Sequence, residues 1–459
     1  MQLTPGPAAG ESADAGSERP DAGLIASARI ALQQLPLQNG APEGSEPPAR
    51  LLGLAVSGGS DSMAMLHVFA QIAAGLGWQL EVATVDHRLR PEAALEAQDV
   101  ARICQGLGLT HEILIWDDHP QTGNMPAAAR EARYALLASW ARRRGIAYVT
   151  LAHTANDQAE TFLMGLSRAA GLEGLSGMRP AWDRDGIRFL RPFLGENREQ
   201  LRDFLRRRGL GWHDDPTNEA DRYSRVKARR ALAALEPLGL GLDQLTQSIR
   251  NLSQVAGLLR KATADCAEAI CRFETGALMI RAHDFWSQDP EMQRRLLVAA
   301  IRWFSGACYP PRADSVASLQ RVMMAEGRTA TLGGCRFARI AKPGARLSDG
   351  DILITREPRA VSGPQPWTPG LIWDHRWRID GPEATGGSET AGLEVRALTA
   401  AGLARAKDWR DSGLRREALI VSPALWQGDR LVAAPLLPGF SSEWRLDLYP
   451  SFGSFILSH

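Results

Sequence analysis

Between residues 50 and 153, short apolar runs alternate with longer amphipathic segments. The strand-like runs are residues 51–56, 79–86, 110–116 and 147–153. The segments between them have the apolar spacing of helices. Strands that alternate with helices form βαβ units, in which the strands are parallel and helices cover both faces of the sheet. We therefore expect an α/β fold with a parallel, doubly wound sheet, and a ligand site at the carboxyl ends of its strands.

The composition of the remaining chain predicts three further parts. The first residues are small, acidic and rich in Pro and Gly, so we expect 1–49 to be a disordered extension before a catalytic domain over 50–230. Residues 231–360 are mainly helical and amphipathic. After a Pro/Gly-rich joint, residues 365–459 are expected to form a small α+β domain.

Charge and cysteine content limit the class of protein. The formal net charge is +1, so any contact with nucleic acid must come from a local basic patch. The five cysteines form no CxxC pair, which is typical of a reduced, cytoplasmic protein without a disulfide framework. An uncharged apolar run of about 18 residues, the minimum for a membrane span, does not occur in the sequence.

The hexapeptide SGGSDS follows the first strand-like run, and a helix is predicted directly after it. Two glycines let the backbone approach a ligand and turn N–H groups toward it, and the helix N-terminus adds partial positive charge. We expect this loop to bind the phosphates of a nucleotide, with the loop carboxylate holding a bridging Mg²⁺ ion. The candidate binding residues are Ser57, Gly58, Gly59, Ser60, Asp61 and Ser62, with Asp61 also the candidate metal ligand and a candidate catalytic residue.

A simple turn, with Asp61 or Ser60 capping the helix, is the alternative for this loop. A lone Gly-Gly turn would favour that alternative. The position after the first strand, with three hydroxyls and a carboxylate, favours the phosphate site.

A second polar group follows the fourth strand-like run, in LAHTANDQAET at 151–161. His153, Asp157 and Glu160 are spaced by four and three positions, so they would line one face of a helix that begins near residue 154. They could bind a metal, position an amine, or act as acid and base. Each alone could be part of a solvated helix face or a cap, but the cluster at a strand end favours function.

Basic residues supply two further candidate sites. Arg130 and Arg133 lie on the helix predicted over 126–145, where they could neutralise a pyrophosphate leaving group, hold a nucleic-acid phosphate, or simply face solvent. Residues 187–230 contain 12 basic and 7 acidic residues. This excess could bind RNA phosphates, although a run of arginines is more often a solvated face.

SGGSDS resembles the SGGxDS signature of the PP-loop, or N-type, ATP pyrophosphatases, which cleave ATP between the α and β phosphates to form an adenylated intermediate. Three further segments and a PTN tripeptide extend the resemblance, over residues 50–230, to the tRNA(Ile)-lysidine synthetase family. These are VDHRLR at 85–90, AAAREARY at 127–134, LAHTANDQAET at 151–161 and PTN at 216–218.

The resemblance implies an enzyme that uses ATP and Mg²⁺ to modify the isoleucine tRNA that carries a CAU anticodon. Its wobble cytidine would attack the α-phosphate of ATP, and the ε-amine of free L-lysine would then displace AMP to give lysidine. In this scheme Asp157 and Glu160 handle lysine, and the region 231–360 binds tRNA. A homodimer is compatible with the sequence, which does not determine the oligomeric state.

Three positions depart from the family pattern. Arg88 stands where glycine is frequent, Asn156 where a second aspartate is frequent, and Val226 where asparagine is frequent. These differences weaken any role assigned to those three positions. They leave the phosphate loop and Asp157 unaffected.

Three other functions fit the sequence less well. Two of them need features that the sequence lacks, and the third does not explain carboxylates that the sequence has. A PP-loop tRNA thiolase generally needs CxxC cysteines. An amidotransferase-type synthetase needs a source of ammonia, and neither an N-terminal cysteine nor a glutaminase segment is present. A non-catalytic nucleotide-sensing RNA-binding module would leave the carboxylates beyond the fourth strand without a purpose.

Overall fold

Two compact units, Met1–Ala256 and Gly257–His459, make up the chain. The computed structural model describes residues 21–35, 50–120, 122, 124–214, 224–325, 329–340, 350–381, 392–406, 409–410, 413–437, 440 and 443–458. The division between the units falls within the long helix α9 (Leu242–Ile270), whereas the sequence predicted a boundary near residue 230.

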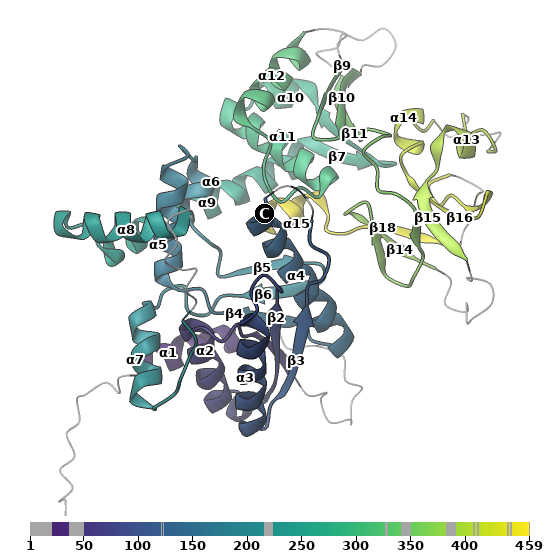
Figure 1. Cartoon of the computed structure of the whole chain (residues 1–459). Helices are drawn as coiled ribbons and strands as arrows, with labels where there is room; N and C mark the ends of the chain where they lie inside the picture. The colour runs from purple at the N-terminus through teal and green to yellow at the C-terminus, as the bar shows by residue number, and fades with distance from the viewer. Residues whose placement is uncertain are drawn as a thin grey trace, which may run out of the picture. The chain divides into compact units, whose positions relative to one another are not determined.

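Six strands form the sheet of the first unit, in the order β3-β2-β1-β4-β6-β5 (Figure 1). Their bounds are β1 (Arg50–Ala55), β2 (Trp78–Asp86), β3 (Thr110–Ile115), β4 (Tyr148–Leu151), β5 (Ala181–Arg184) and β6 (Ile187–Leu190). The pairs from β3 to β6 are parallel, and the edge pair β5–β6 is antiparallel. The predicted parallel sheet is confirmed, and the β5–β6 hairpin extends it beyond the four predicted strands.

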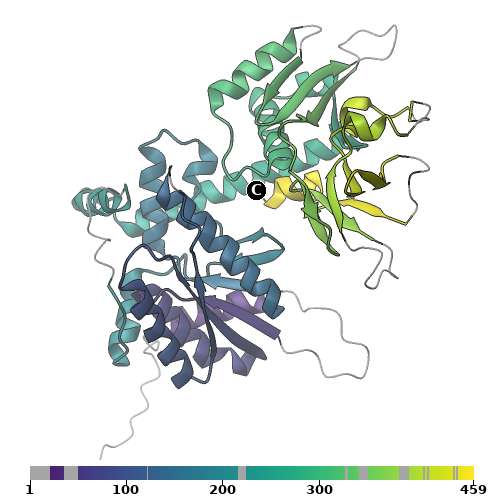
Figure 2. The ribbon, with the colours of Figure 1, turned by 45° about the vertical axis from the view of Figure 1, so that its right-hand side comes forward.

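Helices cover both faces of this sheet, as Figure 2 shows. One face carries Leu52 and Leu54 of β1, and it shares its core with side chains from four helices. These are α1 (Ala22–Gln33), α2 (Ser60–Ile72), α3 (Ala93–Gly106) and α7 (Arg198–Arg207). The other face, which carries Ala55, packs on α4 (Met125–Arg144). A Cβ on Gly53 would lie 2.9 Å from the Trp140 ring of α4, so glycine permits this close approach.

Helix α1 contradicts the expected disorder of residues 1–49 over the part that it occupies. Leu24, Ala28 and Leu32, spaced by four positions, are buried in the core of the first unit. The Ser27 hydroxyl donates a hydrogen bond of 2.6 Å to Glu196 Oε1. The prediction followed the composition of the first residues and overlooked the helical spacing of LIASARIAL at 24–32.

The position of β1 fixes where a ligand can bind. β1 lies between β2 and β4, so the order of the strands reverses between β1 and β4. In doubly wound sheets ligands bind at this switch point, beyond the carboxyl ends of the strands. Here the chain continues from β1 into α2 and from β4 into α5 (Ala155–Leu166). In the described part of this unit, the remaining helical elements are η1 (Ala74–Leu76), α6 (Leu172–Leu175), α8 (Ser224–Leu235) and η3 (Glu236–Leu238).

The second unit contains three antiparallel sheets in its described part, with strand orders β7-β8-β11-β10-β9, β12-β15-β16-β17 and β13-β14-β18. Its strands are β7 (Cys271–Glu274), β8 (Ala277–Arg281), β9 (Thr329–Leu332), β10 (Cys335–Ile340), β11 (Asp351–Arg356), β12 (Gln365–Pro366), β13 (Leu371–Trp373), β14 (Trp377–Asp380), β15 (Leu393–Ala397), β16 (Pro423–Gln427), β17 (Arg430–Ala433) and β18 (Arg445–Leu448). Its helices are α10 (Ala282–Trp286), α11 (Pro290–Ser305), α12 (Ala313–Met324), α13 (Thr399–Leu403), α14 (Arg416–Leu419) and α15 (Phe452–Ser458). The helices expected over 231–360 are present, together with a five-stranded sheet that the apolar spacing did not predict.

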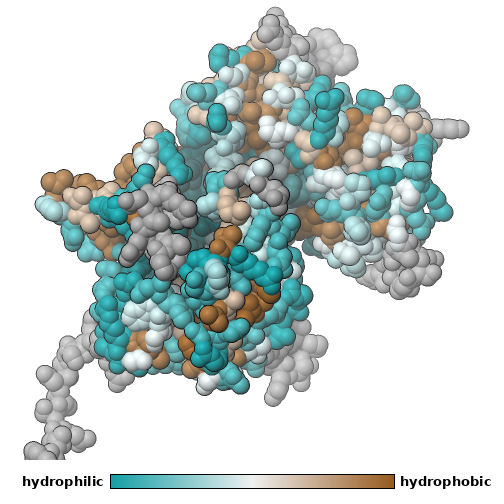
Figure 3. Space-filling model, viewed as in Figure 1, coloured by the Kyte–Doolittle hydropathy of each residue, from teal (hydrophilic) through white to brown (hydrophobic). Residues whose placement is uncertain are grey.

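The surface visible in Figure 3 is mainly hydrophilic, and hydrophobic residues gather over α8. Leu238, in the 3-10 turn that follows α8, is 74% exposed. Among the described residues, none of the helices has both the length and the apolar character needed to span a bilayer.

Candidate active site

The SGGSDS loop connects β1 to α2 at the switch point of the sheet. Gly58 has a φ of +87°, a conformation that strains any residue with a Cβ. The Ser57 N–H donates a 3.1 Å hydrogen bond to Ser62 Oγ, and the Ser62 hydroxyl donates a 2.9 Å bond to the Gly59 carbonyl oxygen. Within the described residues, side chains do not cap the N-terminus of α2, so the alternative of a simple capped turn is disfavoured. The N–H groups of the first turn are available to an anion.

His213 lies against this loop. The His213 N–H donates a 2.9 Å hydrogen bond to the Gly58 carbonyl oxygen, and the ring Nε2 lies 3.0 Å from Asp99 Oδ2. A Cβ on Gly58 would lie 3.4 Å from the His213 ring. His213 was not among the predicted site residues. Its contact with the loop comes from chain topology, which no local sequence signal reveals.

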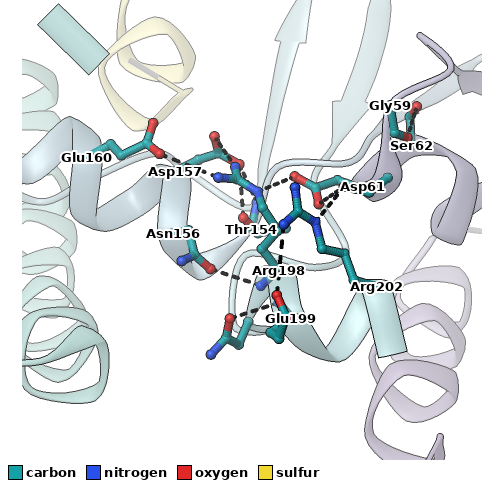
Figure 4. A network of polar contacts seen from close by, with 12 residues as sticks. Gly59, Asp61, Ser62, Thr154, Asn156, Asp157, Glu160, Arg198, Glu199 and Arg202 are labelled. Carbon is teal, nitrogen blue, oxygen red and sulfur yellow. Dashed lines mark hydrogen bonds and ion pairs between the residues drawn. The ribbon is translucent and has the colours of Figure 1, made fainter. Parts of the chain in front are cut away.

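One guanidinium group joins the loop to the residues beyond β4 (Figure 4). Arg198 Nε lies 2.8 Å from Asp61 Oδ2, Nη2 lies 3.1 Å from Asp157 Oδ1, and Nη1 lies 3.5 Å from Glu160 Oε1. The Arg198 side chain is only 18% exposed. The structure therefore brings together three predicted site carboxylates, around an arginine that the sequence analysis counted only as part of a basic segment.

The start of α7 holds Arg198 in this position. Asn197 caps the helix, because its Oδ1 accepts the Glu199 N–H at 3.0 Å and its own N–H donates to Gln200 Oε1 at 2.7 Å. The Arg198 N–H donates a 2.9 Å hydrogen bond to Asn156 Oδ1. Asn156 thus supplies the acceptor oxygen that an aspartate, frequent here in the family, would also supply.

A second capping box positions Asp157 at the start of α5. Asp157 Oδ2 accepts the Thr154 N–H at 2.9 Å and the Thr154 hydroxyl at 3.0 Å, which leaves Oδ1 to Arg198. Burial alone would raise the pKa of Asp157, but the charge of Arg198 and the hydrogen bond from the Thr154 N–H lower it. Burial raises the pKa of Asp61 despite the opposing charge of Arg198. The two carboxyl groups on the same guanidinium thus have pKa values shifted in opposite directions.

Glu160 has one engaged and one unengaged oxygen. Arg229 Nε donates a 2.6 Å hydrogen bond to Oε1. Oε2 has no hydrogen-bond partner among the described residues, although the side chain is only 1% exposed. Buried polar atoms are normally hydrogen-bonded, so this oxygen is suited to accept a hydrogen bond from a donor group of a ligand.

His153 lies just before α5 and contacts a different arginine. Its Nδ1 accepts a 3.1 Å hydrogen bond from Arg191 Nε. Burial and the charge of Arg191 hold the pKa of His153 well below its usual range, and the charges of Arg133 and Arg130 act in the same direction. The Arg130 guanidinium lies 5.3 Å from the centre of the Tyr134 ring. The predicted Arg130 and Arg133 are therefore electrostatic neighbours of His153.

Asp61 is the candidate ligand for a Mg²⁺ ion that would arrive with ATP. Its Oδ1 accepts a weak 3.3 Å hydrogen bond from the Ser60 hydroxyl. Among the described residues, this site included, groups of three or more His, Cys, Asp or Glu side chains that could hold a metal by themselves do not occur. Mg²⁺ commonly takes one or two carboxylates and fills its remaining positions with phosphate oxygens and water.

Much of the basic segment over 187–230 is neutralised by neighbouring carboxylates. Arg207 and Arg208 pair with Asp21 of the first unit's N-terminal segment. Arg206 pairs with Glu199 and Asp203. The run of arginines therefore has acidic partners and is a weaker phosphate-binding candidate than its composition indicated. The PTN tripeptide lies outside the described residues.

Arg88 illustrates a departure from the family pattern that the backbone explains. Its φ is +49°, in the left-handed region that glycine enters without strain. Its N–H donates a 2.8 Å hydrogen bond to Asp86 Oδ1. The turn thus keeps the conformation that a glycine would adopt, and the Cβ of Arg88 makes this conformation less favourable than it would be for glycine.

The nucleotide loop at the switch point of a parallel sheet defines this chain as a PP-loop ATPase, and residues 32–236 match the PP-loop domain. The chain is 43% identical over 421 residues to the tRNA(Ile)-lysidine synthase of Ruegeria pomeroyi, across 90% of this chain and 96% of that relative. It is 33% identical over 413 residues to the tRNA(Ile)-lysidine synthase of Brucella suis, across 86% and 88% of the two chains. The chain belongs to the tRNA(Ile)-lysidine synthase family.

Among solved structures, the U34-tRNA thiolase NcsA from Methanococcus maripaludis is a distant match. Its TM-score is 0.42 and its identity 14%, across 50% of this chain and 78% of that chain.

Proposed function

We propose that this chain converts the wobble cytidine of a CAU-anticodon isoleucine tRNA into lysidine, in two steps. The cytidine O2 attacks the α-phosphorus of ATP, and the bond to the β-phosphate breaks to release pyrophosphate. The neutral ε-amine of L-lysine then attacks C2 of the adenylated base, AMP leaves with O2, and the amine gives up a proton. The family membership of the chain supports this reaction.

The contact of Arg198 with Asp61, Asp157 and Glu160 is the observation that carries the proposal. Asp61 belongs to the phosphate loop, where ATP would bind. Asp157 and Glu160 belong to the helix after β4. A reaction that adenylates a base and then adds an amine needs an anion site and a cation site next to each other, and this network joins the two.

The lysine step would use the carboxylates of α5. Glu160 Oε2, buried and without a described partner, could accept a hydrogen bond from the ε-ammonium group. The lowered pKa of Asp157 keeps that carboxylate ionised, which favours binding of the cation. The ammonium must lose a proton before it attacks, and a carboxylate in contact with it is the candidate acceptor.

The adenylation step would use the phosphate loop and the arginines near His153. The N–H groups at the start of α2 would bind phosphate oxygens, and Asp61 would hold the Mg²⁺ that reduces their charge. Arg130 and Arg133 would neutralise the pyrophosphate that leaves. Recognition of the tRNA by the second unit, and a cytoplasmic location, belong to the same proposal.

The test combines pyrophosphate release with the transfer of labelled lysine to RNA. Purified full-length protein, ATP and total tRNA are incubated with and without lysine, beside Asp61→Ala and the matched control Asp203→Ala. Asp203 is a half-exposed carboxylate that pairs with Arg206 on α7. We expect lysine incorporation in the wild type and in Asp203→Ala, and its loss in Asp61→Ala.

Two other outcomes would support a different function. Pyrophosphate release without lysine incorporation would keep the adenylating ATPase but point to another nucleophile or another tRNA base. ATP binding without turnover, under conditions where tRNA also binds, would favour the non-catalytic RNA-binding module.

A further inference from the structure

Arg191 lies beside His153 and has three other neighbouring groups. It follows β6 directly, and its guanidinium lies 3.7 Å from the centre of the Trp182 ring. Nη1 donates a 2.7 Å hydrogen bond to the Arg179 carbonyl oxygen. Tyr134 is an electrostatic neighbour of the same guanidinium. Another donor of this guanidinium, Nε, donates a 3.1 Å hydrogen bond to His153 Nδ1.

This hydrogen bond determines where the imidazole carries its proton. Burial lowers the pKa of Arg191 to about 10, so the guanidinium is still protonated at neutral pH and can only donate. His153 Nδ1 must then present its lone pair. A neutral imidazole with a lone pair on Nδ1 carries its single proton on Nε2.

The charges around His153 oppose a second proton. Arg191 approaches from the end of β6, Arg130 and Arg133 approach from α4, and these three cations disfavour the imidazolium form. Asp157 of α5 is the opposing anion. Asp157 is itself neutralised by Arg198, which limits its ability to stabilise a charged ring.

The outward nitrogen is available to a ligand. Within the described residues, His153 Nε2 has no hydrogen-bond partner, and the residue is partly rather than fully buried. An N–H group among three arginines faces a region of positive potential, where a phosphoryl oxygen is the natural acceptor.

We propose that Arg191 is a positioning residue that fixes His153 as the Nε2–H tautomer, so that His153 acts as a hydrogen-bond donor to a phosphoryl oxygen and not as a base. The tautomer follows from the geometry alone. The donor role rests on the proposed function and narrows it, because proton removal from the lysine amine then falls to a carboxylate.

The tautomer can be measured without any substrate. Two-bond ¹H–¹⁵N spectra of the ¹⁵N-labelled full-length protein report the protonation of its nine histidines, and His153→Gln identifies the signals of His153. We expect a proton on Nε2 only, unchanged as the pH falls from 8 to about 5.5, below the ordinary histidine pKa of about 6.5. A proton on Nδ1, or titration of wild-type His153 near pH 6.5, would overturn the proposal.

Variants of Arg191 test its part in this tautomer. In Arg191→Met, His153 should titrate at a higher pH than in the wild type and lose its single-tautomer signature. Arg188→Met is the matched control, since Arg188 lies on β6, is 44% exposed and pairs with Asp183. An unchanged His153 spectrum in a folded Arg191→Met protein would refute the role of Arg191. If Arg191→Met does not fold, the wild-type spectra still decide the tautomer.

Activity tests the donor role. Glutamine places an amide N–H where the histidine Nε2–H lies, whereas asparagine places it nearer Nδ1. We expect His153→Gln to retain at least about tenfold more lysine incorporation than His153→Asn, roughly the effect of one charged hydrogen bond. Equal activity of the two variants would refute the donor role. Absence of lysine incorporation in the wild type would instead refute the proposed function and leave the spectra to decide the tautomer.

Discussion

Arg198 Nε and Asp61 Oδ2 lie 2.8 Å apart, although 137 positions separate the two residues in the sequence. The pair is largely removed from solvent, with 18% of each side chain exposed. A buried charge whose partner is removed loses its compensation and destabilises the fold. Arg198 therefore fixes the phosphate loop relative to α5, and its substitution should affect both halves of the site.

Arg198→Lys should retain the fold but lose most of the lysine incorporation. An ammonium group keeps the positive charge, but it cannot donate in a fixed fork to Asp61, Asp157 and Glu160 together. The loss of one charged hydrogen bond costs about 1.5–3 kcal/mol, so we expect activity to fall by about ten- to a hundredfold. Steady-state lysine incorporation measures this change, and Arg206→Lys, on the exposed side of α7, is the control. Equal activity of the two variants would show that the Arg198 bridge is dispensable.

Gly58→Ala should weaken ATP binding more than a comparable glycine substitution elsewhere. Gly58 and Gly77 both have positive φ, +87° and +73°, so alanine strains either position by about 1–2 kcal/mol. Only Gly58 lies in the phosphate loop, and a Cβ at Gly77 would meet nothing within 4 Å. We expect similar losses in thermal stability but reduced ATP affinity in Gly58→Ala alone, as measured by calorimetric titration. Equal ATP affinities would argue against phosphate binding by this loop.

Asp157 should contribute stability that depends on pH. Its pKa in the folded protein is lowered from the usual 3.8, so its stabilising effect is present above that value and is lost as the pH falls through the lower folded pKa. Asp157→Asn should therefore be less stable than the wild type by about 2 kcal/mol at pH 7. This difference should stay constant down to about pH 5 and shrink below about pH 4. Calorimetric melting temperatures across this range, with Asp203→Asn as control, measure it. A difference that grows toward acid pH would contradict the assigned direction of the pKa shift.

The parallel sheet and the phosphate loop were predictable because their signals are local. The LLGLAV run and the glycines of SGGSDS lie within 12 residues of each other, at 51–62. The bridge by Arg198 was not predictable, since it depends on α7 packing beside α2 after a long excursion of the chain. A local signal did exist: Asn197 and Gln200 form a capping box, which places Arg198 in the first turn of α7. That pattern predicts where the helix starts, but not which carboxylates it faces.

Gly53→Val should destabilise the first unit through overpacking. Valine has high strand propensity, so the local effect on β1 would be favourable. Its Cβ would nevertheless lie 2.9 Å from the Trp140 ring and 3.1 Å from a Val149 methyl group, both in the core. Overpacking of this kind costs about 1–3 kcal/mol. Gly75→Ala is the control, because a Cβ there meets nothing within 4 Å. We expect the melting temperature of Gly53→Val to be lower than that of Gly75→Ala. A Gly53→Val protein as stable as Gly75→Ala would mean that α4 can move away from the sheet.

Glu160→Gln should raise the KM for lysine more than it lowers kcat. The substitution is isosteric and keeps an oxygen that can accept the Arg229 Nε hydrogen bond, but it removes the negative charge. If Glu160 Oε2 accepts the lysine ammonium, a neutral amide binds that cation less tightly by about 1.5–3 kcal/mol, which corresponds to a rise in KM of about ten- to a hundredfold. The KM for ATP should stay nearly constant, because Glu160 lies on α5 and not in the phosphate loop. Glu199→Gln, on the exposed part of α7, is the matched control and should leave both KM values unchanged. A fall in kcat at constant KM for lysine would place Glu160 in the chemical step, as the proton acceptor, and not in lysine binding.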